Sequence, residues 1–110
     1  MEQDTIVLCA ASVYSQKYYF NREFDSLPQG IKEELQIMCV LFTEEVGGII
    51  RLEFNEDGEL SLITEAEEED ILYDEIGSAL KVKQLQKDKR ELFEALETYF
   101  KVFFLEQTDL

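Results

Sequence analysis

The stretch EFNEDGELSLITE, residues 53–65, has oxygen-bearing side chains at spacings that suggest a metal site. An EF-hand calcium loop has oxygen ligands at positions one, three and five, glycine at six and a bidentate glutamate at twelve. With Gly58 at position six, position twelve falls on Thr64, which cannot supply two carboxylate oxygens. In this alignment Glu53, Asn55 and Asp57 take positions one, three and five, and Glu65 comes one residue after position twelve. These four are therefore candidates only for weak metal binding.

The same stretch fits a β-hairpin better, because its flanks alternate between apolar and polar residues as strands do. A three-residue loop over residues 56–58 puts Gly58 last, where the chain needs a left-handed residue. Loops of two or four residues would turn the apolar residues of one strand to the opposite face of the sheet. The three-residue loop pairs Phe54 with Leu60, Leu52 with Leu62, and Ile50 with Thr64. We therefore expect a hairpin over about residues 49–64.

Other catalytic chemistry has little support in the sequence. Histidine is absent, which removes the commonest general base and most zinc sites. The pair Gly47-Gly48 lacks the further glycines and the lysine of a phosphate-binding loop. Carboxylates abound, but a catalytic pair needs a cleft, and 110 residues offer little material to build one. An enzyme is the last-ranked hypothesis, and no cofactor is expected.

Two cysteines, Cys9 and Cys39, lie inside apolar runs. Buried free thiols are the favoured interpretation, because a buried thiol behaves as a small hydrophobic group. A disulfide or redox pair is the alternative, although there is no Cys-x-x-Cys motif and no basic leader before the first apolar run.

The charge is both large and unevenly distributed. The chain has 25 acidic and 10 basic side chains, a formal charge of −15. Residues 44–75 hold thirteen acidic side chains and one basic residue, Arg51, whereas residues 81–90 hold five basic residues and one acid. A nucleic-acid partner and an anionic membrane are disfavoured, because both need a basic face. The candidate interaction surface is the densest acidic run, Glu65, Glu67, Glu68, Glu69 and Asp70.

One or two helices are expected before the hairpin. Residues 7–20 fit both a helical face and a strand alternation, and their length and alanines favour a helix. Ser26 followed by Pro28 and Gln29 resembles a capping box at the start of a second helix, with Gly47-Gly48 as its end. Residues 37–42, IMCVLF, are apolar all round, which leaves a buried helix or a strand; the helix is favoured.

Two helices are expected after the hairpin. Acidic residues 65–70 suit the first turn of a helix that runs to about residue 86, with Leu72, Ile76 and Leu80 in its apolar stripe. The run Asp88 to Glu91 either opens another helix or kinks the same one. The last helix has a wide apolar arc, consistent with a core helix or with an exposed patch at one edge. Its residues in that arc are Leu92, Phe93, Leu96, Tyr99, Phe100, Phe103 and Phe104.

The sequence thus predicts an α+β fold in one domain over residues 1–110: N-terminal helices, a hairpin and two C-terminal helices on its apolar face. The hydrophobic content of 45% argues against disorder, and no apolar run is long enough to span a bilayer. A cytoplasmic location is therefore expected. A hairpin with two strands would leave an edge free for self-pairing, which keeps a homodimer open. Residues of the hairpin are expected to meet Leu92, Leu96, Tyr99 and Phe103.

Four segments together resemble a family of small, acidic, uncharacterised proteins from anaerobic Gram-positive bacteria, carried as a domain of unknown function. They are QKYYFNREF, LPQGIKEELQIMCVLFTEEVGGII, LYDEIGSALK and KRELFEALETYFKVFFL. The resemblance covers nearly the whole chain and implies a bacterial cytoplasmic protein, but it supplies no catalytic or binding residues.

These observations favour a non-catalytic interaction domain. Its acidic middle third would bind a basic protein partner. The alternative is a weak metal or small-molecule binder that uses the carboxylates near the hairpin turn. The sequence also leaves open that the acidic run serves only solvation.

Overall fold

The computed structural model describes residues 4–105; residues 1–3 and 106–110 lie outside the described part. In chain order its elements are β1 (Ile6–Ser12), β2 (Lys17–Phe20), the short 3-10 helix η1 (Arg22–Phe24), α1 (Gln29–Val46), β3 (Ile49–Phe54), β4 (Leu60–Glu65), α2 (Glu75–Asp88) and α3 (Arg90–Phe103).

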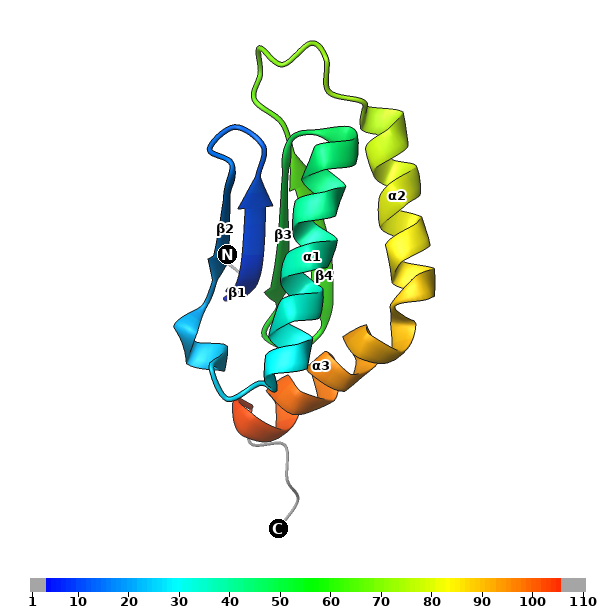
Figure 1. The fold of residues 1–110 in the computed structure, drawn as a ribbon. Coiled ribbons are helices and arrows are strands. Elements are labelled where there is room, and N and C mark those ends of the chain that lie inside the picture. Colours follow the sequence, from blue (N-terminus) through cyan, green and yellow to red (C-terminus); the bar gives the residue numbers. More distant parts are fainter. Residues whose placement is uncertain (1–3, 106–110) are drawn as a thin grey trace.

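The strands form one antiparallel sheet in the order β2-β1-β3-β4, and the helices lie on one side of it (Figure 1). Helix α1 runs along the sheet, α3 crosses one end of the molecule, and α2 stands beside α1. Alternation along β3 turns Ile50, Leu52 and Phe54 into the core, while Arg51 and Glu53 face the opposite side. The predicted α+β class is confirmed.

The prediction of a helix over residues 7–20 is wrong, because this segment forms β1, a turn and β2. Strand β1 pairs with β2 on one side and with β3 on the other, so its backbone groups are satisfied within the sheet. Its small buried side chains, Cys9 and Ala11, face the core. The periodicity of this segment fitted both structures, and pairing with the distant β3 selects the strand.

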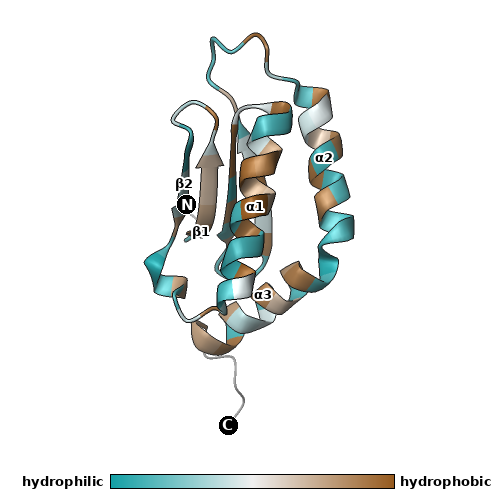
Figure 2. Cartoon of the chain, viewed as in Figure 1, coloured by the Kyte–Doolittle hydropathy of each residue, from teal (hydrophilic) through white to brown (hydrophobic). Residues whose placement is uncertain are grey.

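Helix α1 confirms the second N-terminal helix and its apolar segment 37–42. Its buried stripe packs on the sheet and consists of Leu35, Met38, Cys39 and Phe42. Ile37 and Leu41 remain exposed, which explains why the segment reads as apolar all round. Hydrophobic bands recur along α1 in Figure 2. The expected cap differs: Pro28 holds the N-cap position, and the Ser26 hydroxyl bonds to the Tyr99 hydroxyl at 2.7 Å.

The β3–β4 hairpin has the predicted register in full. Phe54 lies opposite Leu60, Leu52 opposite Leu62, and Ile50 opposite Thr64. Gly58 closes the turn with a φ of 85°, the left-handed conformation that the three-residue loop requires. Local turn chemistry and hydrophobic pattern therefore determine this register together.

The segment expected to begin a helix at residues 65–70 instead contains the end of β4, at Glu65, and the start of a loop, and α2 begins only at Glu75. Asp74 is its N-cap, and its carboxylate accepts a hydrogen bond from the Gly77 amide at 2.8 Å. The carboxylate of Asp70 accepts a bond from the Leu72 amide, which holds the chain in a turn. Aspartate favours such turns over helix interiors for this reason.

Helices α2 and α3 are separate, which settles the two alternatives for residues 88–91 in favour of a second helix. Lys89 is both the C-cap of α2 and the N-cap of α3, so the junction is a sharp elbow. Asp88, the expected cap, is the last residue of α2.

An aromatic cluster joins η1 and α3 to the hairpin. The rings of Phe54 on β3 and Phe100 on α3 stack with centroids 4.2 Å apart, and Phe24 of η1 lies 5.6 Å from Phe54 and 6.2 Å from Phe100. Helix α3 therefore covers the hairpin as expected. Phe103 does not: it is 69% exposed and contacts Tyr99 at the edge of the cluster.

We expect Phe100→Ala to lower the free energy of unfolding by about 3–5 kcal/mol, because it empties the centre of this cluster. Phe103→Ala is the matched control and should cost about 1 kcal/mol or less, since its ring is already in water. Urea unfolding followed by circular dichroism measures both. Equal losses in the two variants would contradict the cluster as the centre of the core.

Candidate functional site

Two of the suggested metal ligands are bound to an arginine. Arg51 donates through Nε to Glu53 at 2.8 Å and through Nη1 to Glu65 at 2.6 Å. The hydrogen bonds to Glu65 and Glu53 raise the pKa of the Arg51 guanidinium. The structure thus brings these two carboxylates together on the sheet face opposite the helices. There they bind the guanidinium of Arg51.

The other two candidate ligands shape the hairpin turn. The Asn55 side-chain oxygen accepts hydrogen bonds from the amides of Asp57 and Glu59, each at 2.9 Å. Among residues 4–105, no group of three or more His, Cys, Asp or Glu residues is placed to hold a metal ion. The side-chain oxygens of Glu53 and Glu65 thus serve the Arg51 pairs and that of Asn55 serves the turn, to which Asp57 contributes its amide.

The candidate interaction residues lie mainly on the loop of residues 66–74, called here the acidic loop. Glu67, Glu68 and Glu69 are exposed on it. The Tyr14 hydroxyl, from the β1–β2 turn, donates to Asp70 at 2.6 Å and accepts from the Glu67 amide at 3.0 Å. The hydrogen bond to Asp70 raises the pKa of Tyr14 above its ordinary value of 10.0. One side chain thus holds both ends of the acidic run.

A second tyrosine holds the end of the acidic loop nearest α2. The Tyr73 hydroxyl donates to Ser78 at 2.7 Å, and its ring lies against Gly48. Gly48 has a φ of 73°, and a Cβ there would lie 2.6 Å from both the Tyr73 ring and the Glu65 carbonyl oxygen. Glycine is therefore required at this position, where the end of α1, the end of β4 and the acidic loop meet.

Four exposed aliphatic side chains follow these acids along the chain, and we call them the aliphatic ridge. Their exposed fractions are 91% for Ile71, 88% for Leu72, 76% for Ile76 and 63% for Leu80. Three of them were expected in the buried stripe of α2, which was wrong. The inner side of α2 is formed by Ser78 and Leu85 instead. The four-residue spacing of residues 72, 76 and 80 marks a helix face in the sequence, but not which face is buried.

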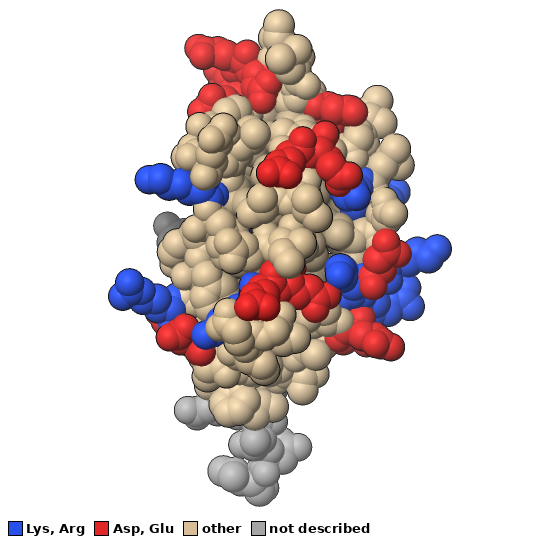
Figure 3. All heavy atoms as spheres, viewed as in Figure 1, with Lys and Arg blue, Asp and Glu red and all other residues tan. Residues whose placement is uncertain are grey.

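The two ends of α2 carry opposite charge. Figure 3 shows acidic side chains at the end of the molecule where the acidic loop lies, and lysine and arginine side chains on the side where α2 ends. Among the described residues, the acids Glu67, Glu68 and Glu69 form no ion pair. The same holds for the exposed bases Lys83, Lys87 and Arg90. Within the described part of the chain, both groups of charges are therefore without an ion-pair partner.

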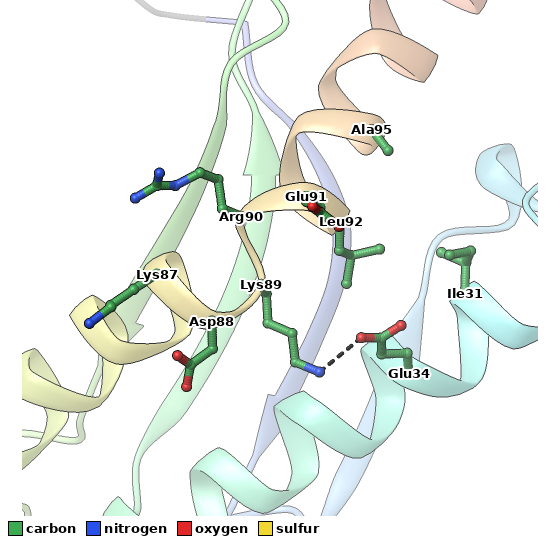
Figure 4. Close-up of a pocket in the computed structure, with 9 residues that line it drawn as sticks. All are labelled: Ile31, Glu34, Lys87, Asp88, Lys89, Arg90, Glu91, Leu92 and Ala95. Atoms are coloured by element: carbon green, nitrogen blue, oxygen red, sulfur yellow. Dashed lines mark hydrogen bonds and ion pairs between the residues drawn. The ribbon is translucent and has the colours of Figure 1, made fainter.

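Helices α1 and α2 are joined by ion pairs across a shallow apolar groove of about 620 Å³. Lys81 pairs with Glu45 and Lys89 with Glu34, each at 2.8 Å. A second hollow of about 740 Å³ lies at the α2–α3 elbow (Figure 4). Its lining mixes charges of both signs with Ile31, Leu92 and Ala95, and its Lys89 is bound to Glu34.

The two cysteines are buried and free, which confirms the favoured interpretation. Their sulfur atoms lie 3.9 Å apart, between β1 and α1. The contact with Cys9 and burial raise the pKa of the Cys39 thiol far above its ordinary value, so it stays protonated and unreactive at neutral pH.

The structure defines a two-layer α+β protein whose most distinctive feature is a charged surface with exposed aliphatic side chains. The chain belongs to the family of unknown function DUF6145, which matches residues 5–108. This match confirms the resemblance to an uncharacterised family. Comparison with curated proteins gave no match, and comparison with solved structures gave none. Within residues 4–105, no helix has both the length and the apolar character needed to cross a membrane.

We expect Tyr14→Phe to loosen the acidic loop, because it removes both hydrogen bonds of the hydroxyl. Amide hydrogen exchange should become several-fold faster across residues 66–74, above all at Glu67. The control is Tyr19→Phe on the exposed part of β2, which should leave loop exchange unchanged.

The Tyr14 contact also predicts a dependence on pH. Because the pKa of Tyr14 is raised in the folded protein, its stabilising effect is complete below pH about 10 and is lost as the pH rises through the folded pKa. The exchange difference between wild type and Tyr14→Phe should therefore shrink at alkaline pH. A difference that stays constant through this range would contradict the assignment.

Proposed function

We propose that this chain is a non-catalytic protein-interaction domain, and that the acidic loop and the aliphatic ridge form its binding surface. The partner surface would be basic with an apolar centre. Complementary charge would speed association and orient the two proteins, while buried aliphatic side chains would supply most of the affinity.

The observation that carries this proposal is the exposure of Ile71 and Leu72, at 91% and 88%, inside the most acidic part of the chain. A segment that serves only solvation needs charge and gains nothing from two adjacent aliphatic side chains in water. A contiguous exposed apolar patch with a polar rim is typical of interaction sites.

The anchors of the loop support the same conclusion. Tyr14 and Tyr73 fix the acidic loop at both ends through hydrogen bonds of 2.6–3.0 Å. A loop that is ordered before binding loses less conformational entropy when a partner binds. The geometry thus presents the ridge in one arrangement.

We expect that replacing Glu67, Glu68 and Glu69 together by lysine weakens binding to the partner about tenfold or more at low salt. The partner would be captured from native lysate on the immobilised wild-type protein, identified by mass spectrometry, purified and titrated against each variant. The double substitution Ile71→Ser and Leu72→Ser should weaken binding at low and high salt alike, because it removes apolar contact rather than charge.

The matched control replaces Glu44, Glu91 and Glu94 by lysine, which makes the same change in net charge at other exposed positions. This control should retain wild-type affinity. If it weakens binding as much as the loop variant, net charge alone governs association and the proposed surface is wrong. Unchanged binding in both the loop variant and the serine variant would also refute the proposal.

A further inference from the structure

Helix α2 has apolar side chains on two opposite faces. Its inner face packs on the body of the protein through Ser78 and Leu85. At 3.6 residues per turn, Ile76 and Leu80 lie one turn apart on the outer face, and both are more than half exposed. A helix that packs on a single partner needs only one apolar stripe. The outer stripe of α2 is therefore a face without a partner in the monomer.

The two ends of this outer face differ in charge. The acidic loop precedes the stripe, while Lys83, Lys87 and Arg90 follow it. In Figure 4 the side chains of Lys87 and Arg90 point away from the Lys89–Glu34 pair. Lys83, Lys87 and Arg90 are all exposed, and none of them forms an ion pair with another described residue.

A face that is acidic at one end and basic at the other complements itself when two copies meet antiparallel. A two-fold axis near Leu80 would set the acidic end of each helix against the basic end of the other, as a closed dimer requires. A parallel arrangement would oppose like charges. The charge order along α2 therefore selects both the partner and its direction.

Helix geometry agrees with this pairing. At 1.5 Å per residue, Ile76 lies about 6 Å from Leu80 along the axis and Lys83 about 4.5 Å from it on the other side. The difference of about 1.5 Å is within reach of a lysine side chain. Ile76 of one copy would meet the apolar stem of Lys83 of the other, with its ammonium group left in water.

We propose that the partner of the ridge is a second copy of this chain, bound through antiparallel pairing of the outer faces of α2. This inference rests on the proposed function, since it names the partner of the same surface. The two Leu80 side chains meet at the centre, and the acidic loop of each copy lies near the α2–α3 elbow of the other.

Sedimentation velocity of the full chain tests the pairing, over concentrations up to about 100 μM. The wild type should dimerise, and Leu80→Glu should raise the dimer dissociation constant about 100-fold, because it places two like charges at the axis. The matched control is Ile37→Glu on α1, a similarly exposed aliphatic position at 59%, and it should dimerise like the wild type. Circular dichroism should show the same helix content in all three.

A charge exchange tests the antiparallel direction. Variant one carries Lys83→Glu and Lys87→Glu, and variant two carries Glu67→Lys and Glu69→Lys. Each variant alone should form a weaker homodimer than the wild type, because the two ends of its outer face now carry like charge. A mixture of the two should form a heterodimer, since each acidic α2 then meets a basic one.

Three results would overturn the inference: a monomeric wild type, a Leu80→Glu variant that still dimerises, or two charge variants that do not associate when mixed. The proposed function has a separate outcome. If the wild type is monomeric but binds a different protein through Glu67 to Glu69 and the ridge, the surface stands and its partner is not a second copy. If the wild type is monomeric and the loop variants bind as wild type does, both proposals fail.

Discussion

The contact of Phe24, Phe54 and Phe100 is the interaction on which the rest of the arrangement depends. It joins η1 near the start of the chain, the hairpin in its middle and α3 at its end, with Phe54 and Phe100 stacked 4.2 Å apart. Because α3 is fixed at this end of the sheet, the elbow at Lys89 directs α2 back along the molecule beside α1 (Figure 1). The position of the aliphatic ridge is thus a distant consequence of aromatic packing.

The width of the sheet explains why α2 stays at the margin. Four strands about 4.8 Å apart span about 14 Å between the outer axes, and helices pack about 8–10 Å from one another. One face of such a sheet has room for about two helices, and α1 and α3 already pack against it. Helix α2 is therefore held mainly by neighbouring helices, through Leu85 and the Lys81–Glu45 and Lys89–Glu34 pairs. This leaves the face of α2 that carries Ile76 and Leu80 in water.

The acidic side chains have different surroundings in two parts of the molecule. On the open face of the sheet, Arg51 compensates Glu53 and Glu65 through short hydrogen bonds. In the acidic loop, the two tyrosine anchors fix the backbone but leave the glutamates without internal cations among the described residues. The negative charge of the chain is thus concentrated beside exposed aliphatic side chains, which is the combination that the proposed binding surface uses.

Where short-range chemistry decides the structure, the sequence by itself was enough. The hairpin register follows from Gly58 and the alternation around it, α1 from its stripe and terminal glycine, and the exposure of Glu67 to Glu69 from their charge. Only the tertiary structure decided between helix and strand for residues 7–20, because both periods fit and the partners of β1 on β3 lie 37 to 48 residues away along the chain. It also decided which face of α2 is buried: Leu72, Ile76 and Leu80 have the spacing of a core stripe, but the sheet face was already covered. A helical period identifies a face, whereas burial depends on what space the other elements leave.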